Sequence, residues 1–119
     1  LGGSKWRDVP FKSQASAFDV TYTDVFYVDA SQPAVQAFRR RYRALTEGQQ
    51  PGRLAYVGFD VARYLILHLA RQAEQALPER LRAADLYQGL GTRIQFNDEN
   101  ANEALFLLHY NNADIVLLR

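Results

Sequence analysis

The stretch PGRLAYVGFDVARYLILHL, residues 51–69, decides how the chain folds. Pro51 and Gly52 interrupt whatever precedes them, and few of the residues that follow carry a full charge. Apolar residues then recur at spacings of three and four, which is the period of an α-helix. They form one face with Leu54, Val57, Val61, Leu65 and Leu69, and a second with Ala55, Phe59, Ala62, Ile66 and Ala70. A helix that is apolar on two faces must be covered on both, so we expect it to lie between two layers.

The residues before this helix predict a strand and another helix. Polar and apolar residues alternate in the first half of residues 17–29, which is the period of a β-strand, and apolar residues continue after Asp24 as a further short strand or a change of direction. Ser31 and Pro33 are typical of a helix start, with the serine as the cap, and Gly48 is typical of its end. The inward stripe of this helix is expected to be Val35, Phe38, Tyr42 and Leu45.

The residues after the central helix predict one more helix and then strands. Pro78 and Glu79 begin a helix that is expected to run to about Gln88, with Leu81, Leu86 and Tyr87 inward. Residues 89–91 read as a turn, and strands are expected at 92–96, 103–110 and 115–118. The turns between these strands are expected at the polar segments 97–100 and 111–114.

Bulk composition excludes several classes of function. The 119 residues suffice for one domain with a modest core, and a net charge of +1 gives no overall attraction to nucleic acid or to anionic membranes. The arginines at 39, 40, 41 and 43 surround an apolar stripe, so we interpret them as a solvated helix face. No apolar run is long enough to span a membrane, and the lack of cysteine removes disulfides and thiolate chemistry.

The sequence carries no motif for catalysis or for a cofactor. Neither His68 nor His109 has a second ligand at metal spacing, so we expect both to be structural, with no metal site. No serine lies in a nucleophile elbow, and neither glycine pair forms a phosphate loop. We expect no enzyme activity and no cofactor. Gly58 and Asp60 are expected to act through packing, with a neighbouring backbone close to Gly58.

Several segments, in their order, resemble a known family. Residues 1–4 with Trp6 are similar to a strand-to-glycine-turn segment of the type I periplasmic binding proteins, the branched-chain amino acid receptor class of ABC transporters. Gly58-Phe59-Asp60 resembles the family's G-Y-D-A run, and residues 91–97 resemble its G-x-I-x-F-D run. Further matching positions are Phe38, Tyr42, Gly48, Pro51, Tyr56 and the final hairpin turn at 111–115.

The resemblance implies an α/β fold, the C-terminal part of a two-lobed receptor with Rossmann-like lobes, three main helices and a terminal antiparallel strand set. Residues 1–24 and 92–119 would belong to one lobe, and residues 25–91 to the other. The start of the central helix would then face the cleft, because a helix N-terminus suits an anionic or acceptor group. The implied ligand-binding residues are Ser4, Trp6, Leu54 and Tyr56; Trp6 alternatively caps the edge of the core.

The resemblance implies a periplasmic or lipid-anchored receptor that binds a small molecule for uptake through an ABC permease. Ser4 stands where amino acid receptors of this class carry an acidic residue, which argues against an α-amino acid as the ligand. A regulatory or structural cell-envelope protein that binds a protein partner is the alternative, and an α/β enzyme is a third. We also expect the chain to pack against a missing N-terminal segment or a second copy.

Overall fold

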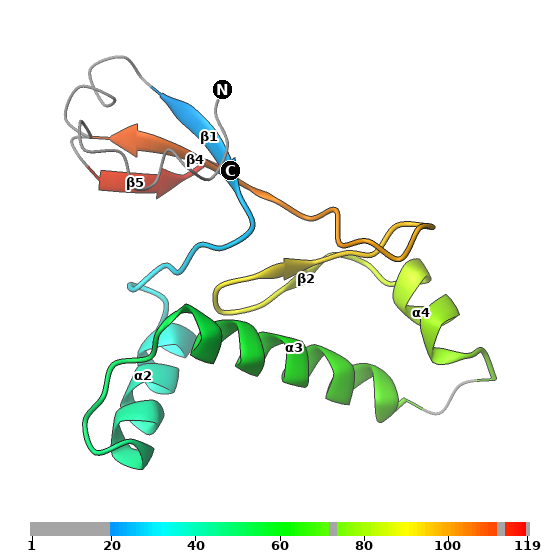
Figure 1. Cartoon of the computed structure of the whole chain (residues 1–119), viewed down its shortest axis with the longest axis horizontal. Coiled ribbons are helices and arrows are strands. Elements are labelled where there is room, and N and C mark those ends of the chain that lie inside the picture. Colours follow the sequence, from blue (N-terminus) through cyan, green and yellow to red (C-terminus); the bar gives the residue numbers. More distant parts are fainter. Residues whose placement is uncertain (1–19, 72–73, 112–113, 119) are drawn as a thin grey trace. The chain divides into compact units, whose positions relative to one another are not determined.

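The computed structural model describes residues 20–71, 74–111 and 114–118, and it divides into two compact units. The described part of the first unit comprises residues 20–27, 105–111 and 114–118, and that of the second unit comprises residues 28–71 and 74–104. The chain therefore passes from the first unit into the second and returns (Figure 1). Ser4 and Trp6 lie outside the described residues.

The first unit is an antiparallel sheet in the order β1-β4-β5. Its strands are β1 (Thr21–Asp24), β4 (Phe106–Asn111) and β5 (Asp114–Leu117). Tyr22 pairs with Leu108, which pairs in turn with Leu117, and the core of the unit is Tyr22, Phe106 and Leu108. The hairpin predicted at the C-terminal end is therefore confirmed, although β4 begins at Phe106 and not at residue 103; apolar strand-forming residues on both sides of a polar turn specify it locally.

The first predicted strand is shorter than expected. The buried carboxylate of Asp24 accepts a hydrogen bond from the Phe26 backbone N–H at 3.1 Å, which turns the chain. The strand therefore ends at Asp24, and the apolar residues 25–28 form no further strand.

The second unit contains helices α2 (Pro33–Leu45), α3 (Arg53–Leu69) and α4 (Leu77–Ala83), with the short strands β2 (Tyr87–Gln88) and β3 (Arg93–Ile94). Helix α2 begins with a proline as predicted, but its cap position is Gln32, and Ser31 instead hydrogen-bonds Asp29. Gly48, with a φ of 87°, donates to the Arg43 carbonyl and ends this helix.

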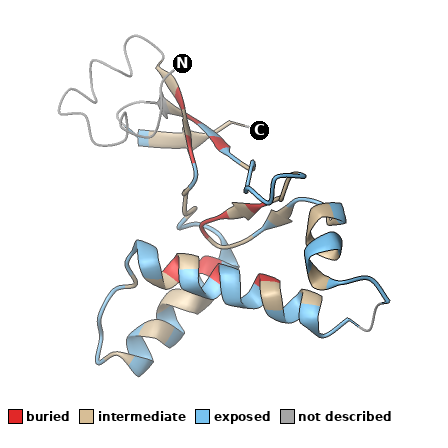
Figure 2. Cartoon of the chain, turned by 45° about the vertical axis from the view of Figure 1, so that its right-hand side comes forward, coloured by how far each residue is buried: buried red, intermediate tan, exposed pale blue. Residues whose placement is uncertain are grey.

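Helix α3 buries a different face from those predicted. Its buried residues are Tyr56, Asp60 and Tyr64, spaced four apart on one side (Figure 2). The predicted apolar faces are largely exposed, with Leu54 at 86%, Ile66 at 64% and Leu69 at 61%. The expectation of two covered faces is therefore wrong for the described residues, because aromatic rings and a hydrogen-bonded carboxylate occupy the contact instead.

Helix α4 ends earlier than predicted. It stops at Ala83, where Ala84 takes an extended conformation, and Tyr87 belongs to β2. Leu86, expected inward, is 49% exposed. Tyr87 pairs with Ile94 across an antiparallel hairpin, whose turn includes the predicted glycine segment. Pairing across this hairpin overrides the helical pattern of residues 84–88.

The described residues therefore form a small mixed α/β structure, with three helices and two small antiparallel sheets. The coarse α/β class is as predicted. Within the part of the chain that the structure describes, no helix has the length and apolar character needed to cross a membrane.

Candidate functional site

In the second unit, a cluster of hydrogen bonds surrounds the carboxylate of Asp60, which is fully buried. Its Oδ1 accepts a hydrogen bond from the Leu90 N–H at 2.7 Å. Its Oδ2 accepts from the N–H groups of Gly91 and Thr92 at 2.9 and 3.0 Å, and from the Thr92 hydroxyl at 3.0 Å. Three successive backbone N–H groups thus form a concave anion site, which the protein fills with its own carboxylate.

Gly89 is required for this arrangement. A Cβ placed on Gly89 would overlap the carboxylate of Asp60. The Gly89 N–H donates to the Thr92 carbonyl at 2.8 Å, which closes the turn. The turn can therefore approach α3 only because position 89 has no side chain.

Gly58, two residues before Asp60, has no such role. A Cβ built there meets no atom within 4 Å. The expectation of a close backbone neighbour at Gly58 is therefore wrong among the described residues. The glycine that makes a close approach is Gly89. The sequence signal for it was the position of Asp60 within an apolar stretch, since a charge buried there needs hydrogen-bond donors.

The first turn of α3 carries two of the residues predicted to bind a ligand. Leu54 is 86% exposed, and Tyr56 is 3% exposed. The Tyr56 hydroxyl accepts a hydrogen bond from Arg39 Nε at 2.7 Å, and its ring lies 5.0 Å from that of Phe38. Tyr56 thus holds α3 against α2, while Leu54, like the neighbouring Arg53, is exposed to solvent.

The start of α3 is also free of its own anionic cap. Gly52 is the N-cap residue, no side chain caps the helix, and the first turn holds no acidic residue. The partial positive charge of the helix start therefore meets no carboxylate from its own first turn. Ligand binding by Leu54 and Tyr56 stays a prediction, as it does for Ser4 and Trp6.

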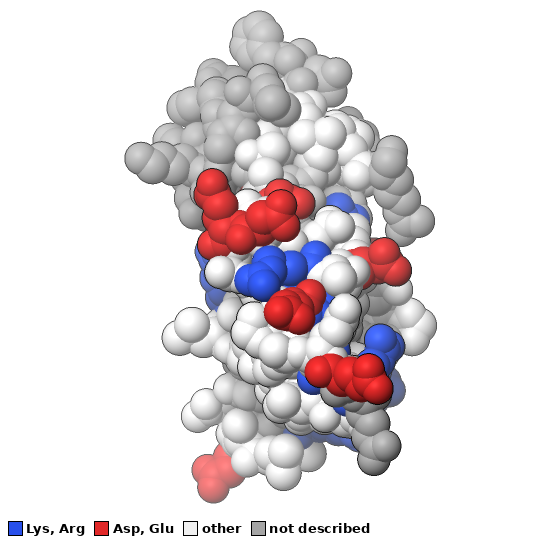
Figure 3. Space-filling view, turned by 90° about the vertical axis from the view of Figure 1, so that its right-hand side faces the viewer, with Lys and Arg blue, Asp and Glu red and all other residues white. Residues whose placement is uncertain are grey.

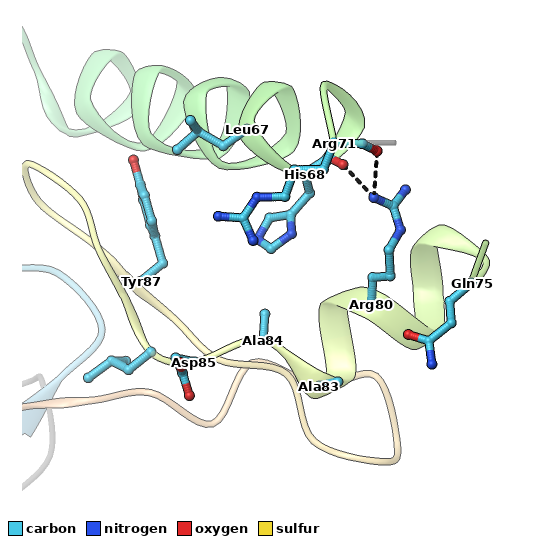
Figure 4. Close-up of a pocket in the computed structure, with 10 residues that line it drawn as sticks. Leu67, His68, Arg71, Gln75, Arg80, Ala83, Ala84, Asp85 and Tyr87 are labelled. Carbon is cyan, nitrogen blue, oxygen red and sulfur yellow. Dashed lines mark hydrogen bonds between the residues drawn. The ribbon is translucent and has the colours of Figure 1, made fainter. Parts of the chain in front are cut away.

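A pocket of about 510 Å³ lies at the opposite end of α3 (Figure 4). It is lined by residues from the end of α3, from α4 and from β2: Leu67, His68, Arg71, Gln75, Arg80, Ala83, Ala84, Asp85, Leu86 and Tyr87. Arg80 Nη1 donates to the carbonyls of His68 at 2.7 Å and of Arg71 at 3.2 Å. These bonds satisfy the last carbonyls of α3 and tie α4 to its C-terminal end.

The titratable groups around this pocket are shifted toward their neutral forms. Burial, and then the charges of Arg71 and Arg80, lower the pKa of His68 below 6.5. Burial raises the pKa of Tyr64, whose ring centroid lies 4.6 Å from that of His68 and 5.3 Å from that of Tyr87. Burial also raises the pKa of Tyr87. At neutral pH the charges on the pocket lining are therefore those of the arginines and of Asp85.

The described residues offer no metal site, because no three His, Cys, Asp or Glu side chains cluster there. His68 is half-buried against Tyr64, and His109 is half-buried in β4 opposite Thr21 and Val116.

The four arginines at positions 39, 40, 41 and 43 of α2 have different surroundings. Arg39 bonds Tyr56, whereas Arg40, Arg41 and Arg43 are exposed. Figure 3 shows acidic and basic side chains mixed on one face of the molecule.

Comparison with known proteins gives no match: no family model, curated protein or solved structure is similar to this chain.

Proposed function

We propose that the chain is part of an extracytoplasmic receptor that binds a small solute. The receptor serves ABC-type uptake, its protein partner is a permease, and it lies in the periplasm or is lipid-anchored in the cell envelope. The observation that carries the proposal is the set of hydrogen bonds from residues 90–92 to Asp60. It joins two of the stretches on which the resemblance to type I periplasmic binding proteins rests.

These two stretches are 30 residues apart, yet they meet through the residues that define them. Asp60 ends the Gly-Phe-Asp segment, and Gly91 and Thr92 begin the second segment. A chance likeness of composition gives no reason for the aspartate of one segment to accept hydrogen bonds from the glycine and threonine of the other. The contact supports a common structural role for both segments.

The course of the chain supports the proposal of a two-lobed receptor. Residues 28–104 form one unit, and the segments on either side of them belong to the other. Two lobes linked by crossing segments are suited to closing on a small molecule. The units divide at 27/28 and 104/105, whereas the proposed lobe boundaries are 24/25 and 91/92. These boundaries and the Rossmann-like character of each lobe remain part of this proposal.

In this proposal the solute contacts the first turn of α3, and Ser4 and Trp6 remain predicted ligand residues from the resemblance alone. The positive end of the α3 dipole suits a carboxylate or another acceptor, since the first turn holds no acidic residue, and the exposed Leu54 is available for an apolar contact. The ligand is a small molecule with an acceptor group, and the serine at position 4 argues against an α-amino acid.

The experiment uses the single tryptophan as a probe. The purified chain is titrated with a panel of small solutes, and tryptophan fluorescence is recorded. We expect a saturable change for one chemical class. Leu54→Ala should weaken binding, whereas Leu45→Ala, a leucine of the same 86% exposure at the end of α2, should not. Equal affinity of these two variants would exclude the proposed site.

The alternative, a cell-envelope protein that binds a protein partner, is favoured by one observation. The exposed side of α3 presents Leu54, Val61, Ile66 and Leu69. Apolar residues gathered in this way are typical of protein contacts. On this alternative a photo-crosslinking residue at position 66 captures one envelope protein, a crosslinker at exposed Gln36 captures none, and no solute changes the fluorescence.

A further inference from the structure

We propose that the pocket between the end of α3, α4 and β2 binds a small organic carboxylate, at a site separate from the solute site at the start of α3. The pocket lies wholly within the second unit. Its volume of about 510 Å³ falls in the range of about 300–1,000 Å³ that is usual for small-molecule sites. The 17 residues of α3 separate the two sites by roughly 20 Å.

The polar lining is cationic, and one cation is available to a ligand. Arg71 and Arg80 against Asp85 leave one positive charge when His68 is neutral. Arg80 is engaged by two main-chain carbonyls. Arg71 is exposed, so its guanidinium is the group that pairs with an incoming carboxylate, in the two-pronged geometry that arginine favours.

The remaining walls select an apolar body for the ligand. Leu67 and Leu86 line the pocket at 46% and 49% exposure, together with two alanines and the ring of Tyr87. Figure 4 shows Leu67 on the α3 side of the pocket and Tyr87 on the β2 side. Burying these exposed leucines favours a ligand with a ring or branched chain over an inorganic anion.

His68 reports on occupancy of the pocket. Its surroundings comprise Arg71 and Arg80, the carboxylate of Asp85, and the neutral rings of Tyr64 and Tyr87. Burial disfavours the imidazolium form, and the charges of the two arginines disfavour it further. A bound carboxylate adds a negative charge, so it raises the pKa of His68 and is itself held more tightly as the pH falls.

The test titrates the whole chain with benzoate and with its neutral isostere benzamide, and follows the His68 ring signals and backbone amides by NMR. We expect a saturable shift with benzoate at residues 67–71 and 80–87, and affinity at least tenfold weaker for benzamide, about 1.4 kcal/mol. Arg71→Gln should lower benzoate affinity by a similar factor. Arg40→Gln, which removes an exposed arginine of α2, should leave it unchanged.

The proposal would be overturned by the lack of a saturable shift up to about 50 mM benzoate, which means no binding stronger than about 2 kcal/mol. Equal affinity for benzamide, or an unchanged benzoate affinity in Arg71→Gln, would also overturn it. Equal binding of inorganic phosphate would overturn the choice of an organic carboxylate. Because shifts at residues 53–57 report on the other end of α3, failure here is distinguishable from failure of the solute site.

Discussion

Replacing Asp60 should show how far its carboxylate holds the second unit together. Asp60→Ala removes the acceptor for three backbone N–H groups and one hydroxyl. Gly91 and Thr92 are buried, so their N–H groups find no water in exchange. A buried donor left without an acceptor costs about 1–3 kcal/mol. Two such donors, with the lost hydroxyl bond, give an expected loss of about 3–5 kcal/mol in the free energy of unfolding.

Two milder substitutions, Asp60→Asn and Thr92→Val, remove part of the same set of hydrogen bonds. An asparagine can turn its oxygen toward Gly91 and Thr92, but its NH₂ group then faces the Leu90 N–H, so one hydrogen bond and the negative charge are lost. We expect a loss of about 2 kcal/mol for Asp60→Asn. Thr92→Val removes a single hydroxyl of nearly the same shape and should cost about 1 kcal/mol.

The assay is urea unfolding followed by far-UV circular dichroism, with amide hydrogen exchange at residues 90–92 as a local readout. We expect the order Asp60→Ala, Asp60→Asn, Thr92→Val from most to least destabilised, and faster exchange of the Gly91 and Thr92 amides in the first two. A loss below about 1 kcal/mol for Asp60→Ala would refute the reasoning, because such a value fits an exposed carboxylate.

Three further predictions follow from the second unit. Gly58→Ala should stabilise the chain by about 1 kcal/mol, since its Cβ meets open space in a helix, whereas Gly89→Ala should destabilise it by pressing on Asp60; opposite signs in urea unfolding check this, and equal signs would contradict it. Tyr64→Phe should leave stability unchanged or raise it by about 1 kcal/mol, because its buried hydroxyl has no hydrogen-bond partner among the described residues; Tyr56→Phe should lower stability by a similar amount by removing the acceptor for Arg39. The pKa of His68, measured by NMR, should lie below 6.5 and rise in Arg71→Gln. Because the folded state favours the neutral ring, its contribution to stability is present above pH 6.5 and is lost as the pH falls below that value. A His68 pKa above 6.5 would refute the proposed effect of burial and of the two arginines.

Elements specified by local pattern were predictable from the sequence. The turn residues 111–114 and the apolar runs on either side predict the β4–β5 hairpin, and Pro33 and Gly48 mark the start and end of α2. Both signals act over a few residues, so no distant contact is needed to read them.

Elements decided by distant contacts were not predictable in the same way. Residues 84–88 continue the helical pattern of α4, but Tyr87 pairs with Ile94 and contacts Tyr64. On α3, apolarity suggested the buried faces, yet the buried stripe is Tyr56, Asp60 and Tyr64. Hydrogen bonds and ring contacts with other elements bury these three residues, and the spacing of apolar residues along the helix carries no information about such contacts.

The candidate sites divide in the same manner. The sequence singled out Asp60 as a residue for packing and stability, but its donors lie 30 to 32 residues away. The pocket at the end of α3 collects residues of three elements, and no motif marks it. An aspartate within an apolar stretch, together with the glycine turn at residues 89–91, was the signal in the sequence that could have indicated the Asp60 contacts.

The most direct test of the receptor proposal is amide hydrogen exchange of the whole chain, with and without the solute that changes tryptophan fluorescence. The proposal predicts slower exchange of the amides at residues 53–57 when the solute is bound, and no slowing in Leu54→Ala at the same solute concentration. Unchanged exchange at residues 53–57 under saturating solute would contradict it.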